Sequence, residues 1–338
     1  MEAGVSEAAP AMSSPPIPRD VQCLAIICPS WVGDTVMATP VFRAARAARP
    51  KARLIGIMRR GLNEVLAGTP WFDEMINCEM KGVLGPIRLG KVLRQCGAEA
   101  ILLLPNSFRS ALGARLSSAA IRVGYDRDGR GWLLTHGKMA PRIHLPVAMI
   151  EYYAALAEFA LGLPSIDTWP ELATTPAERV AAEAILKDVP RPFIVLNPGG
   201  NKPAKRWPPE RFAAVADALA KSDHLAAVVS GSPGEMEVLR AVTKSAKSSI
   251  INLAERGVSL GSLKAVLEQA KLLITNDTGP RHLAAALGTP LITLFGPTDH
   301  RWTTLNCPHE RIVLAEPFLP EELVADRHAK RARSIALP

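Results

Sequence analysis

Short apolar runs alternate with longer amphipathic stretches along the chain, and glycine or small polar residues follow most of the runs. Residues 271–299 show this pattern most clearly. An apolar run ends at the polar cluster 276–279, a helical pattern follows up to Gly288, and a second apolar run covers 291–295. Short apolar runs bounded by turn residues are typical of buried strands, and their alternation with helices is typical of parallel sheets. The pattern therefore predicts a strand–helix–strand unit here.

The same order of strand, glycine-containing loop and helix recurs on both sides of a proline-rich stretch at 164–192. The predicted strands cover 24–28, 53–58, 72–77, 100–104, 121–124, 193–197, 226–230, 250–253, 272–274, 291–295 and 311–314. The predicted helices cover 35–48, 86–96, 110–117, 147–161, 177–186, 208–221, 236–245, 259–269, 279–287 and 320–333. This alternation predicts an α/β fold with two Rossmann-like parallel-sheet domains and a cleft between them.

The length of the chain agrees with this division, because 338 residues exceed one typical hydrophobic core. We expect a disordered leader over 1–20, a first Rossmann-like domain over 21–168, a linker and domain entry over 169–189, a second Rossmann-like domain over 190–318, and a C-terminal helix over 319–338 that crosses back to the first domain.

Charge and composition narrow the class of partner. The net charge is +8 and the pI is near 9.4, which favours an anionic partner. The sequence has no zinc finger, no aromatic-and-basic RNA-binding signature and no dense basic helix, so we expect no nucleic acid. A substrate rich in phosphate or carboxylate is the better interpretation.

Cysteine usage and the absence of long apolar segments indicate the compartment. The five cysteines are irregularly spaced and form no C-x-x-C pair, which disfavours a disulfide or zinc framework and favours a reducing cytoplasm. No apolar run approaches the roughly 18 residues that a membrane span needs. The leader contains Glu2 and Glu7 and lacks the apolar segment of a signal peptide. We expect a cytoplasmic monomer.

Loops after predicted strands hold the candidate chemistry. A helix that starts at Gly279 would point backbone N–H groups and the positive end of its dipole at a ligand, which suits phosphate. Asp34 lies at a predicted helix start, where it either caps the helix or faces the cleft. No G-x-G-x-x-G fingerprint occurs, which disfavours an NAD-dependent oxidoreductase. Asp126 and Asp128 lie in a basic glycine-rich loop, and we expect no metal there.

Three blocks of sequence resemble the heptosyltransferases of glycosyltransferase family nine, which have the GT-B fold. The blocks are Pro-Ser-Trp-Val-Gly-Asp at 29–34, Pro-Gly-Gly at 198–200 with Pro-Ala-Lys-Arg-Trp-Pro at 203–208, and Thr-Asn-Asp-Thr-Gly-Pro-x-His at 275–282 with Phe-Gly-Pro-Thr at 295–298. The first block is most similar to the heptosyltransferase II group. Their shared order and spacing over about 21–318 make the resemblance specific.

The resemblance implies an inverting, metal-independent transfer of heptose from ADP-heptose to the lipopolysaccharide inner core, without a cofactor. The first domain would bind the acceptor and the second the donor. Asp34 matches the proposed general base of the family. The residues that would bind the donor diphosphate and sugar are Lys205, Asn276, Asp277, Thr278 and Gly279. Those expected on the ribose and adenine side are Glu235, Gly199 and Gly200.

Arginines at strand ends and loops of the first domain are candidates for the anionic acceptor, because guanidinium forks suit phosphate and carboxylate. They are Arg59, Arg60, Arg109, Arg127 and Arg130. A lipopolysaccharide acceptor also implies peripheral contact with the cytoplasmic face of the inner membrane.

Departures from the family pattern leave the exact donor sugar open, and nothing in the sequence identifies the acceptor hydroxyl. The departures occur at 200–202, at 280–281 and at His300. Two other functions stay open as alternatives: a non-catalytic nucleotide-sugar or carbohydrate-binding protein, and a nucleotide-sugar epimerase. The epimerase is disfavoured because it would need acid–base residues on both faces of the sugar.

Overall fold

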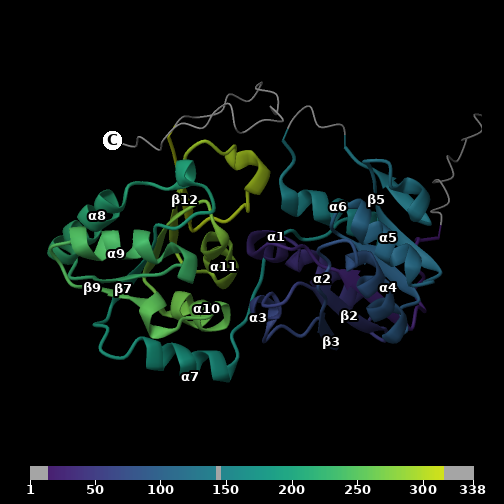
Figure 1. The fold of residues 1–338 in the computed structure, drawn as a ribbon, viewed down its shortest axis with the longest axis horizontal. Coiled ribbons are helices and arrows are strands. Elements are labelled where there is room, and N and C mark those ends of the chain that lie inside the picture. The colour runs from purple at the N-terminus through teal and green to yellow at the C-terminus, as the bar shows by residue number, and fades with distance from the viewer. Residues whose placement is uncertain (1–13, 142–145, 316–338) are drawn as a thin grey trace, which may run out of the picture.

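The computed structural model describes residues 14–141 and 146–315, which form two six-stranded parallel sheets with helices on both faces (Figure 1). This architecture confirms the predicted α/β fold. The predicted helix at 319–338 lies outside the described residues.

The first sheet has the strand order β3-β2-β1-β4-β5-β6. Its strands are β1 (Cys23–Ile27), β2 (Arg53–Met58), β3 (Glu74–Asn77), β4 (Ala100–Leu103), β5 (Ile121–Asp126) and β6 (His136–Met139). Its helices are α1 (Val32–Met37), α2 (Thr39–Ala48), α3 (Asn63–Leu66), α4 (Gly85–Gln95), α5 (Phe108–Leu116), the 3-10 turn η1 (Gly131–Leu133) and α6 (Met149–Leu161). The order reverses between β1 and β4, so the loop after β1 opens at a topological switch point, where ligands bind in such folds.

The second sheet repeats the design, with the strand order β12-β11-β10-β7-β8-β9. Its strands are β7 (Phe193–Asn197), β8 (Ala226–Val229), β9 (Ile250–Asn252), β10 (Leu272–Asn276), β11 (Leu291–Phe295) and β12 (Glu310–Leu314). Its helices are α7 (Pro176–Ile185), α8 (Pro209–Ser222), α9 (Met236–Ser245), α10 (Leu260–Gln269) and α11 (Gly279–Leu287), with 3-10 turns η2 (Pro203–Lys205), η3 (Pro233–Glu235), η4 (Leu253–Arg256) and η5 (His300–Thr303). Here the switch point lies between β7 and β10.

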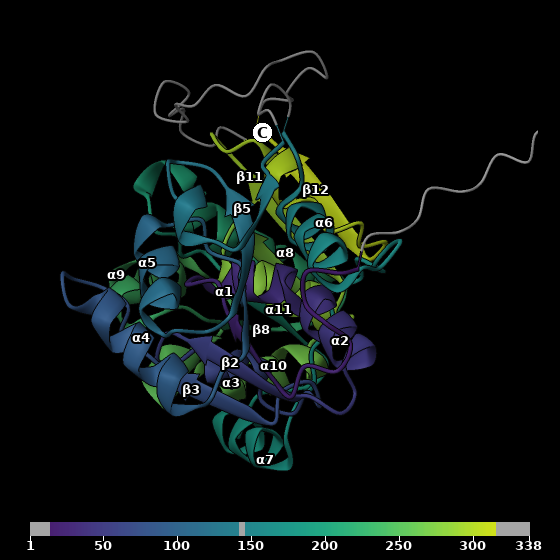
Figure 2. The ribbon, with the colours of Figure 1, turned by 90° about the vertical axis from the view of Figure 1, so that its right-hand side faces the viewer.

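Each sheet has helices on both faces; we call inner the helix layer that belongs to an apolar cluster shared by the two sheets, and outer the layer whose cluster belongs to one sheet alone. Helices α4 and α5 form the outer layer of the first sheet, with α2 and α6 on its other face (Figure 2). Helices α8 and α9 form the outer layer of the second sheet, and α10 and α11 lie on its inner side (Figure 1). One apolar cluster runs through both inner layers, and each outer layer has a cluster of its own.

The inner layers meet where α1 packs on α11 and where α3 packs on α10. At the second contact, Lys264 of α10 is fully buried. Its ammonium group donates to the carbonyl oxygens of Ala67 and Ala173 at 2.8 and 2.9 Å and lies 3.2 Å from Glu178 Oε1. Burial lowers the pKa of Lys264, and the Glu178 carboxylate opposes this effect. Lys264 thus joins the first sheet, the connection between the sheets and α10.

Besides shifts of a few residues at element ends, the structure differs from the sequence-based prediction at three places. The helix predicted over 35–48 is two helices that start at Val32 and break at Ala38, because Pro40 lacks a backbone N–H and sits in the first turn of α2. Strand β6 was not predicted, since most of its side chains are exposed and polar. Residues 14–20 were expected in a disordered leader, yet Ile17 is fully buried and its N–H donates to Ala160 O at 2.9 Å. Residues 1–13 lie outside the described part of the chain.

Candidate active site

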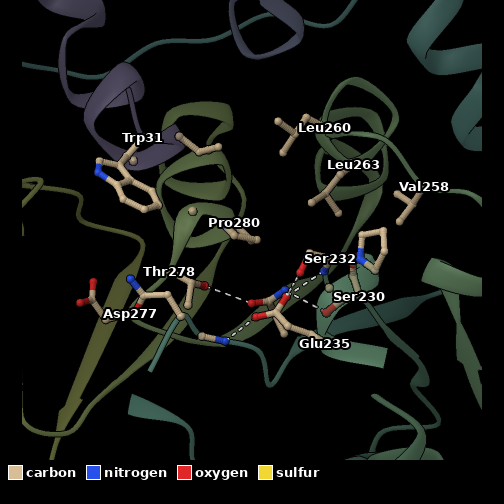
Figure 3. Close-up of a pocket in the computed structure, with 18 of the residues that line it drawn as sticks. Trp31, Ser230, Ser232, Glu235, Val258, Leu260, Leu263, Asp277, Thr278 and Pro280 are labelled. Carbon is tan, nitrogen blue, oxygen red and sulfur yellow. Dashed lines mark hydrogen bonds between the residues drawn. The ribbon is translucent and has the colours of Figure 1, made fainter. Parts of the chain in front are cut away.

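A pocket of about 490 Å³ opens at the switch point of the second sheet and is closed on one side by the start of α1. Figure 3 shows Trp31 on one side and Val258, Leu260 and Leu263 on the other, with Glu235 between them. The pocket therefore has an apolar wall and a polar floor, and its lining comes from both halves of the chain. The polar floor includes Asn197, Gly200, Lys205, Ser230, Glu235, Asp277 and Thr278.

The first turn of α11 points into this pocket without a side-chain cap. Thr278 is the N-cap residue, but its hydroxyl contacts Asn197 Oδ1 at 3.1 Å and the carbonyl oxygen of Asn276 at 3.2 Å. Pro280 lies in the first turn and has no N–H to satisfy. Thr278 and Gly279, both predicted as donor-binding residues, line the pocket. The positive end of the α11 dipole thus faces the cavity, an arrangement that suits an anion.

Lys205 supplies a cation beside this helix start. Its Nζ donates to Asp277 Oδ2 at 3.0 Å, and Arg281 Nη1 lies 3.7 Å from Asp277 Oδ1. Burial acts to raise the pKa of the Asp277 carboxyl, but attraction from Lys205 and Arg281 outweighs burial and holds that pKa below its usual value. Asp277 is therefore ionised, and it holds the Lys205 ammonium group at the pocket wall.

Arg281 is a buried residue whose role sequence reasoning did not find. Its Nε and Nη2 donate to both carboxylate oxygens of Glu310 at 2.6 and 3.0 Å, and its Nη1 donates to Thr303 Oγ1 at 2.9 Å. This fork ties α11 to β12 and η5. Arg281 thus fixes the helix that presents the anion site.

Glu235 joins the two glycine-containing loops at the far end of the pocket. Its Oε1 accepts from the Gly200 N–H at 2.6 Å, and its Oε2 accepts from the Ser232 N–H and hydroxyl at 2.8 and 2.7 Å. A side chain at Gly199 would collide with the Glu235 carboxylate, since its Cβ would lie 2.2 Å from Oε1. Glycine at 199 is thus needed for the approach of the two loops, and Gly199 does not line the pocket itself.

Asn276 was predicted to bind the donor, and the structure assigns it a different role. The residue is fully buried. Its amide nitrogen donates to the carbonyl oxygens of Pro198 and Gly199 at 2.9 and 3.0 Å, and its amide oxygen accepts from the Trp207 N–H at 3.2 Å. These bonds consume its polar atoms and position the loop after β7, so Asn276 acts on the pocket through that loop.

Asp34 lies in the first turn of α1, the third residue of that helix rather than its cap. Trp31 is the N-cap residue, and no side chain caps the helix start. The Asp34 carboxylate forms no hydrogen bond or ion pair with any residue in the described ranges. Burial raises its pKa from 3.8 to about 6. Tyr153 lies close enough that the Asp34 charge adds to the effect of burial in raising the tyrosine pKa. An unpaired carboxyl with a pKa near neutrality has the properties of a general base.

The start of α1 packs closely against α11, and a glycine on each helix, Gly33 and Gly279, allows this approach. A Cβ at Gly33 would lie 2.7 Å from Cδ2 and 2.8 Å from Nε2 of His282, and a Cβ at Gly279 would lie 3.1 Å from Val32. His282 is buried, and its Nδ1 has no hydrogen-bond partner among the described residues. Burial lowers its pKa to about 3, so the ring is neutral. This contact positions the helix with Asp34 against the helix with the anion site.

The five arginines predicted to bind an acceptor separate into two groups. Arg59 and Arg60 are exposed after β2, and Arg109 is exposed in the first turn of α5. Arg127 pairs with Asp128 at 3.1 Å and lines a small cavity opposite Trp302 of the second half. These four stay candidates.

Arg130 does not fit the prediction that it binds the acceptor. It is fully buried, and its guanidinium donates to the carbonyl oxygens of Tyr125, Pro105 and Ser107 at 2.9, 2.6 and 3.3 Å and to Asn106 Oδ1 at 3.3 Å. Its donors are used to hold the loops after β4 and β5 together. Arg130 is therefore a structural residue and has no exposed surface for a ligand.

Ser230 is a pocket residue that sequence reasoning missed. Its hydroxyl is buried and has no hydrogen-bond partner within the described chain. Buried hydroxyls are normally paired, so an unpaired one that faces a cavity is available to a ligand. The apolar wall from the loop before α10 was also missed, because Val258 and Leu260 read as ordinary core residues in the sequence.

In residues 14–141 and 146–315, no three His, Cys, Asp or Glu side chains cluster in a way that could hold a metal ion. None of the helices in these ranges is both long enough and apolar enough to cross a bilayer.

Comparisons with known proteins place the chain in a family. The sequence profile of glycosyltransferase family 9 (heptosyltransferase) matches residues 87–324. Lipopolysaccharide heptosyltransferase 2 of Escherichia coli K12 is 31% identical over 294 residues, covering 82% of this chain and 84% of that protein. The protein of the same name from Salmonella typhimurium is 30% identical with the same coverage.

Structural comparison agrees. The solved structure of Escherichia coli ADP-heptose lipopolysaccharide heptosyltransferase II superposes with a TM-score of 0.76 at 28% identity, covering 86% of this chain and 90% of that one. Each of the three blocks that suggested the resemblance contributes residues to the lining of the pocket described above, although 295–298 do not line it. The profile, the curated relatives and the solved structure all confirm the resemblance. The chain belongs to glycosyltransferase family 9, the heptosyltransferase family.

Proposed function

We propose that the protein transfers heptose from ADP-heptose to the inner core of lipopolysaccharide, with inversion at the anomeric carbon. The relatives named above are lipopolysaccharide heptosyltransferases, and the solved structure that resembles this chain is named for ADP-heptose. The observation that carries the proposal is the pocket itself. It combines an uncapped helix start and a partly buried cation, Lys205, which suit a diphosphate, with an apolar wall that suits a nucleobase.

In this proposal the second half binds the nucleotide. The adenine packs against Val258, Leu260 and Leu263, while Ser230 and Glu235 lie on the ribose side. The diphosphate lies at Thr278 and Gly279, beside Lys205. As the bond to the anomeric carbon breaks, negative charge develops on the diphosphate, and the α11 dipole and the Lys205 cation stabilise it.

In this proposal the first half of the chain binds the acceptor and supplies the general base. Asp34 takes the proton from the attacking hydroxyl as the new glycosidic bond forms, so the proton moves to its carboxylate and the ADP leaves with the bonding electron pair. Arg59, Arg60, Arg109 and Arg127 are proposed to bind the anionic groups of the acceptor.

The direct test is transfer from ADP-heptose to a defined heptose-deficient core acceptor, with the product identified by mass spectrometry. We expect one added heptose, one ADP released per transfer, and full activity in EDTA, since Lys205 and α11 supply the positive charge. A protein that binds ADP but releases none in the presence of donor and acceptor would support the non-catalytic alternative. Activity lost in EDTA and restored by magnesium would contradict the metal-independent mechanism.

Lys205→Ala is expected to weaken ADP binding by roughly 1–3 kcal/mol, because it removes a charge-assisted hydrogen bond to phosphate. Titration calorimetry with ADP measures this loss. The control is Lys202→Ala, which removes an exposed cation three residues earlier in the same loop. Equal ADP affinity in Lys205→Ala and Lys202→Ala would place the diphosphate elsewhere.

A further inference from the structure

The first half of the chain exposes an unusual set of large apolar side chains at one end of its outer layer. Val83 is 90% exposed, Leu84 54% and Ile87 59%, all at the start of α4. Phe108 at the start of α5 is 44% exposed, and Trp132 in η1 is 72% exposed. We call these five side chains the apolar face. Exposed apolar groups of this size gathered in one region mark an interaction site rather than ordinary surface.

Helix packing brings these residues to the same end of the outer layer. Helices α4 and α5 follow neighbouring crossovers of a parallel sheet, so they run in the same direction, and they lie side by side on the side away from α2 and α6 (Figure 2). Gly90 of α4 approaches the Gly113 carbonyl oxygen and Leu116 of α5, where a Cβ would lie 3.1 and 2.9 Å away. The rings of Phe108 and Trp132 are 6.1 Å apart between centroids.

Unpaired cations lie on or beside the two helices that carry most of the apolar face. The exposed residues Lys81, Arg88, Lys91, Arg109 and Arg115 lie on or beside α4 and α5. None of them forms a salt bridge with a carboxylate in the described ranges, whereas many arginines elsewhere, such as Arg43, Arg46 and Arg240, do. The only acid between 81 and 116 is Glu99.

The acids that border this region are few, and part of their charge is engaged. Glu79 accepts from the Lys81 N–H at 3.0 Å, and Asp128 pairs with Arg127 at 3.1 Å. Asp126 lies against Gly131, next to Trp132. The region that contains the apolar face is therefore net positive.

We propose that the apolar face docks on an anionic phospholipid surface, with Val83, Leu84, Ile87, Phe108 and Trp132 at the level of the headgroups. Apolar side chains ringed by cations bind such surfaces through buried apolar area and attraction to anionic lipid, and tryptophan prefers the interface. This inference rests on the proposed function, because a lipid-linked acceptor lies in a membrane.

The location of the face suits that acceptor. The first turns of α4 and α5 follow the carboxyl ends of β3 and β4, the same edge of the sheet on which Asp34 and the exposed Arg59 and Arg60 lie. Docking there would hold the acceptor-binding half against the membrane and leave the nucleotide pocket of the second half open to solution.

The test is flotation of the full chain with vesicles, without donor or acceptor. One vesicle type contains about two thirds phosphatidylethanolamine and one third phosphatidylglycerol, and the other contains phosphatidylcholine only. The variants are Leu84→Glu/Ile87→Glu and Arg88→Glu/Lys91→Glu. The matched control is Val180→Glu/Lys187→Glu, which removes an exposed apolar residue and a nearby exposed cation of the second half.

The parent and the control are expected to float with anionic vesicles and not with phosphatidylcholine, and to dissociate as salt is raised. Either face variant should bind at least about tenfold more weakly, because one loses two surface cations and the other places two acids among the apolar side chains that contact the lipid. Unchanged ADP affinity in the variants would show that they are folded, and it separates this result from any failure of the proposed function.

Two outcomes would overturn the inference. The first is a flotation result in which the parent does not bind anionic vesicles, or in which the face variants bind them as well as the parent does. The other is sedimentation showing that the parent self-associates and that the face variants do not, because the apolar face would then bind a second copy of the chain.

Discussion

Replacing Asp34 by asparagine is expected to lower kcat by about 10²–10⁴-fold, because a neutral amide cannot accept the proton of the acceptor hydroxyl. The side chain keeps its size, so ADP affinity should not change. The parent should also show a pH limb that the variant lacks. Its kcat/KM should rise with pH through about 6, where the buried carboxyl loses its proton, and level off above that value.

The same variant distinguishes a base from a structural carboxylate. The pKa of Asp34 in the folded protein, about 6, lies above its ordinary value of 3.8, so the folded state holds the proton more tightly than the unfolded chain. The free energy of unfolding therefore falls as the pH rises from about 4 to about 6, and above pH 6 the full cost of the buried charge, at most about 3 kcal/mol, is present. Asp34→Asn removes that cost, and its Tm at pH 8 should equal or exceed that of the parent.

A helix cap would behave in the opposite way, with about 1 kcal/mol of stability lost and turnover intact. Measuring kcat and Tm on one preparation separates the two roles. Asp223→Asn, at the exposed end of α8, is the matched control. If turnover survives in Asp34→Asn, the base lies elsewhere in the acceptor half.

Gly33→Ala is expected to lower kcat by about 10²-fold, although it adds only one methyl group. The new Cβ would lie 2.7 Å from the His282 ring, closer than packed atoms come, so α1 must move away from α11. Asp34 is the next residue and moves with the helix. Displacements of about 1 Å at reacting groups cost on the order of 10²-fold in rate. Stability should fall by about 1–3 kcal/mol, as overpacking of a buried contact predicts.

Steady-state kinetics of a double-mutant cycle tests this explanation. His282→Ala removes the ring, so activity in Gly33→Ala/His282→Ala should recover relative to Gly33→Ala alone. Gly234→Ala is the control, since its Cβ would meet nothing nearer than Ser232 Oγ at 4.0 Å. Equal kcat in Gly33→Ala and the parent would mean that the α1–α11 contact does not position the base.

The strands and the pocket loops follow from local patterns and were predictable. Strands over 53–58, 193–197 and 291–295 are apolar runs bounded by charged or turn residues, and their limits agree with the structure. The polar residues after β10 were recognised because ligands bind at the carboxyl ends of parallel strands. Strand β6 was not predicted, because its largely exposed sequence has neither an alternation of apolar and polar residues nor an apolar run.

Residue roles were less predictable, because they depend on contacts between distant segments. Arg130 and Arg109 are alike in the sequence, but only Arg130 meets the carbonyl oxygens at the ends of β4 and β5. Asn276 lies in a family block, yet its amide is used by the loop after β7. The raised pKa of Asp34 also depends on the packing of inner-layer helices around it. A sequence pattern identifies the type of a residue and its position along a helix or strand. It does not identify which distant residues its side chain contacts.

The apolar cluster shared by the two inner layers links the folding of the first half to the folding of the second. The outer layers have clusters of their own, but the packing around α1 is completed by α11 and that around α3 by α10, both from the second half. During synthesis the surfaces of α1 and α3 that pack on α11 and α10 therefore stay uncovered until the second half forms. Because the two sheets share part of one apolar cluster, we expect a single cooperative unfolding transition rather than two.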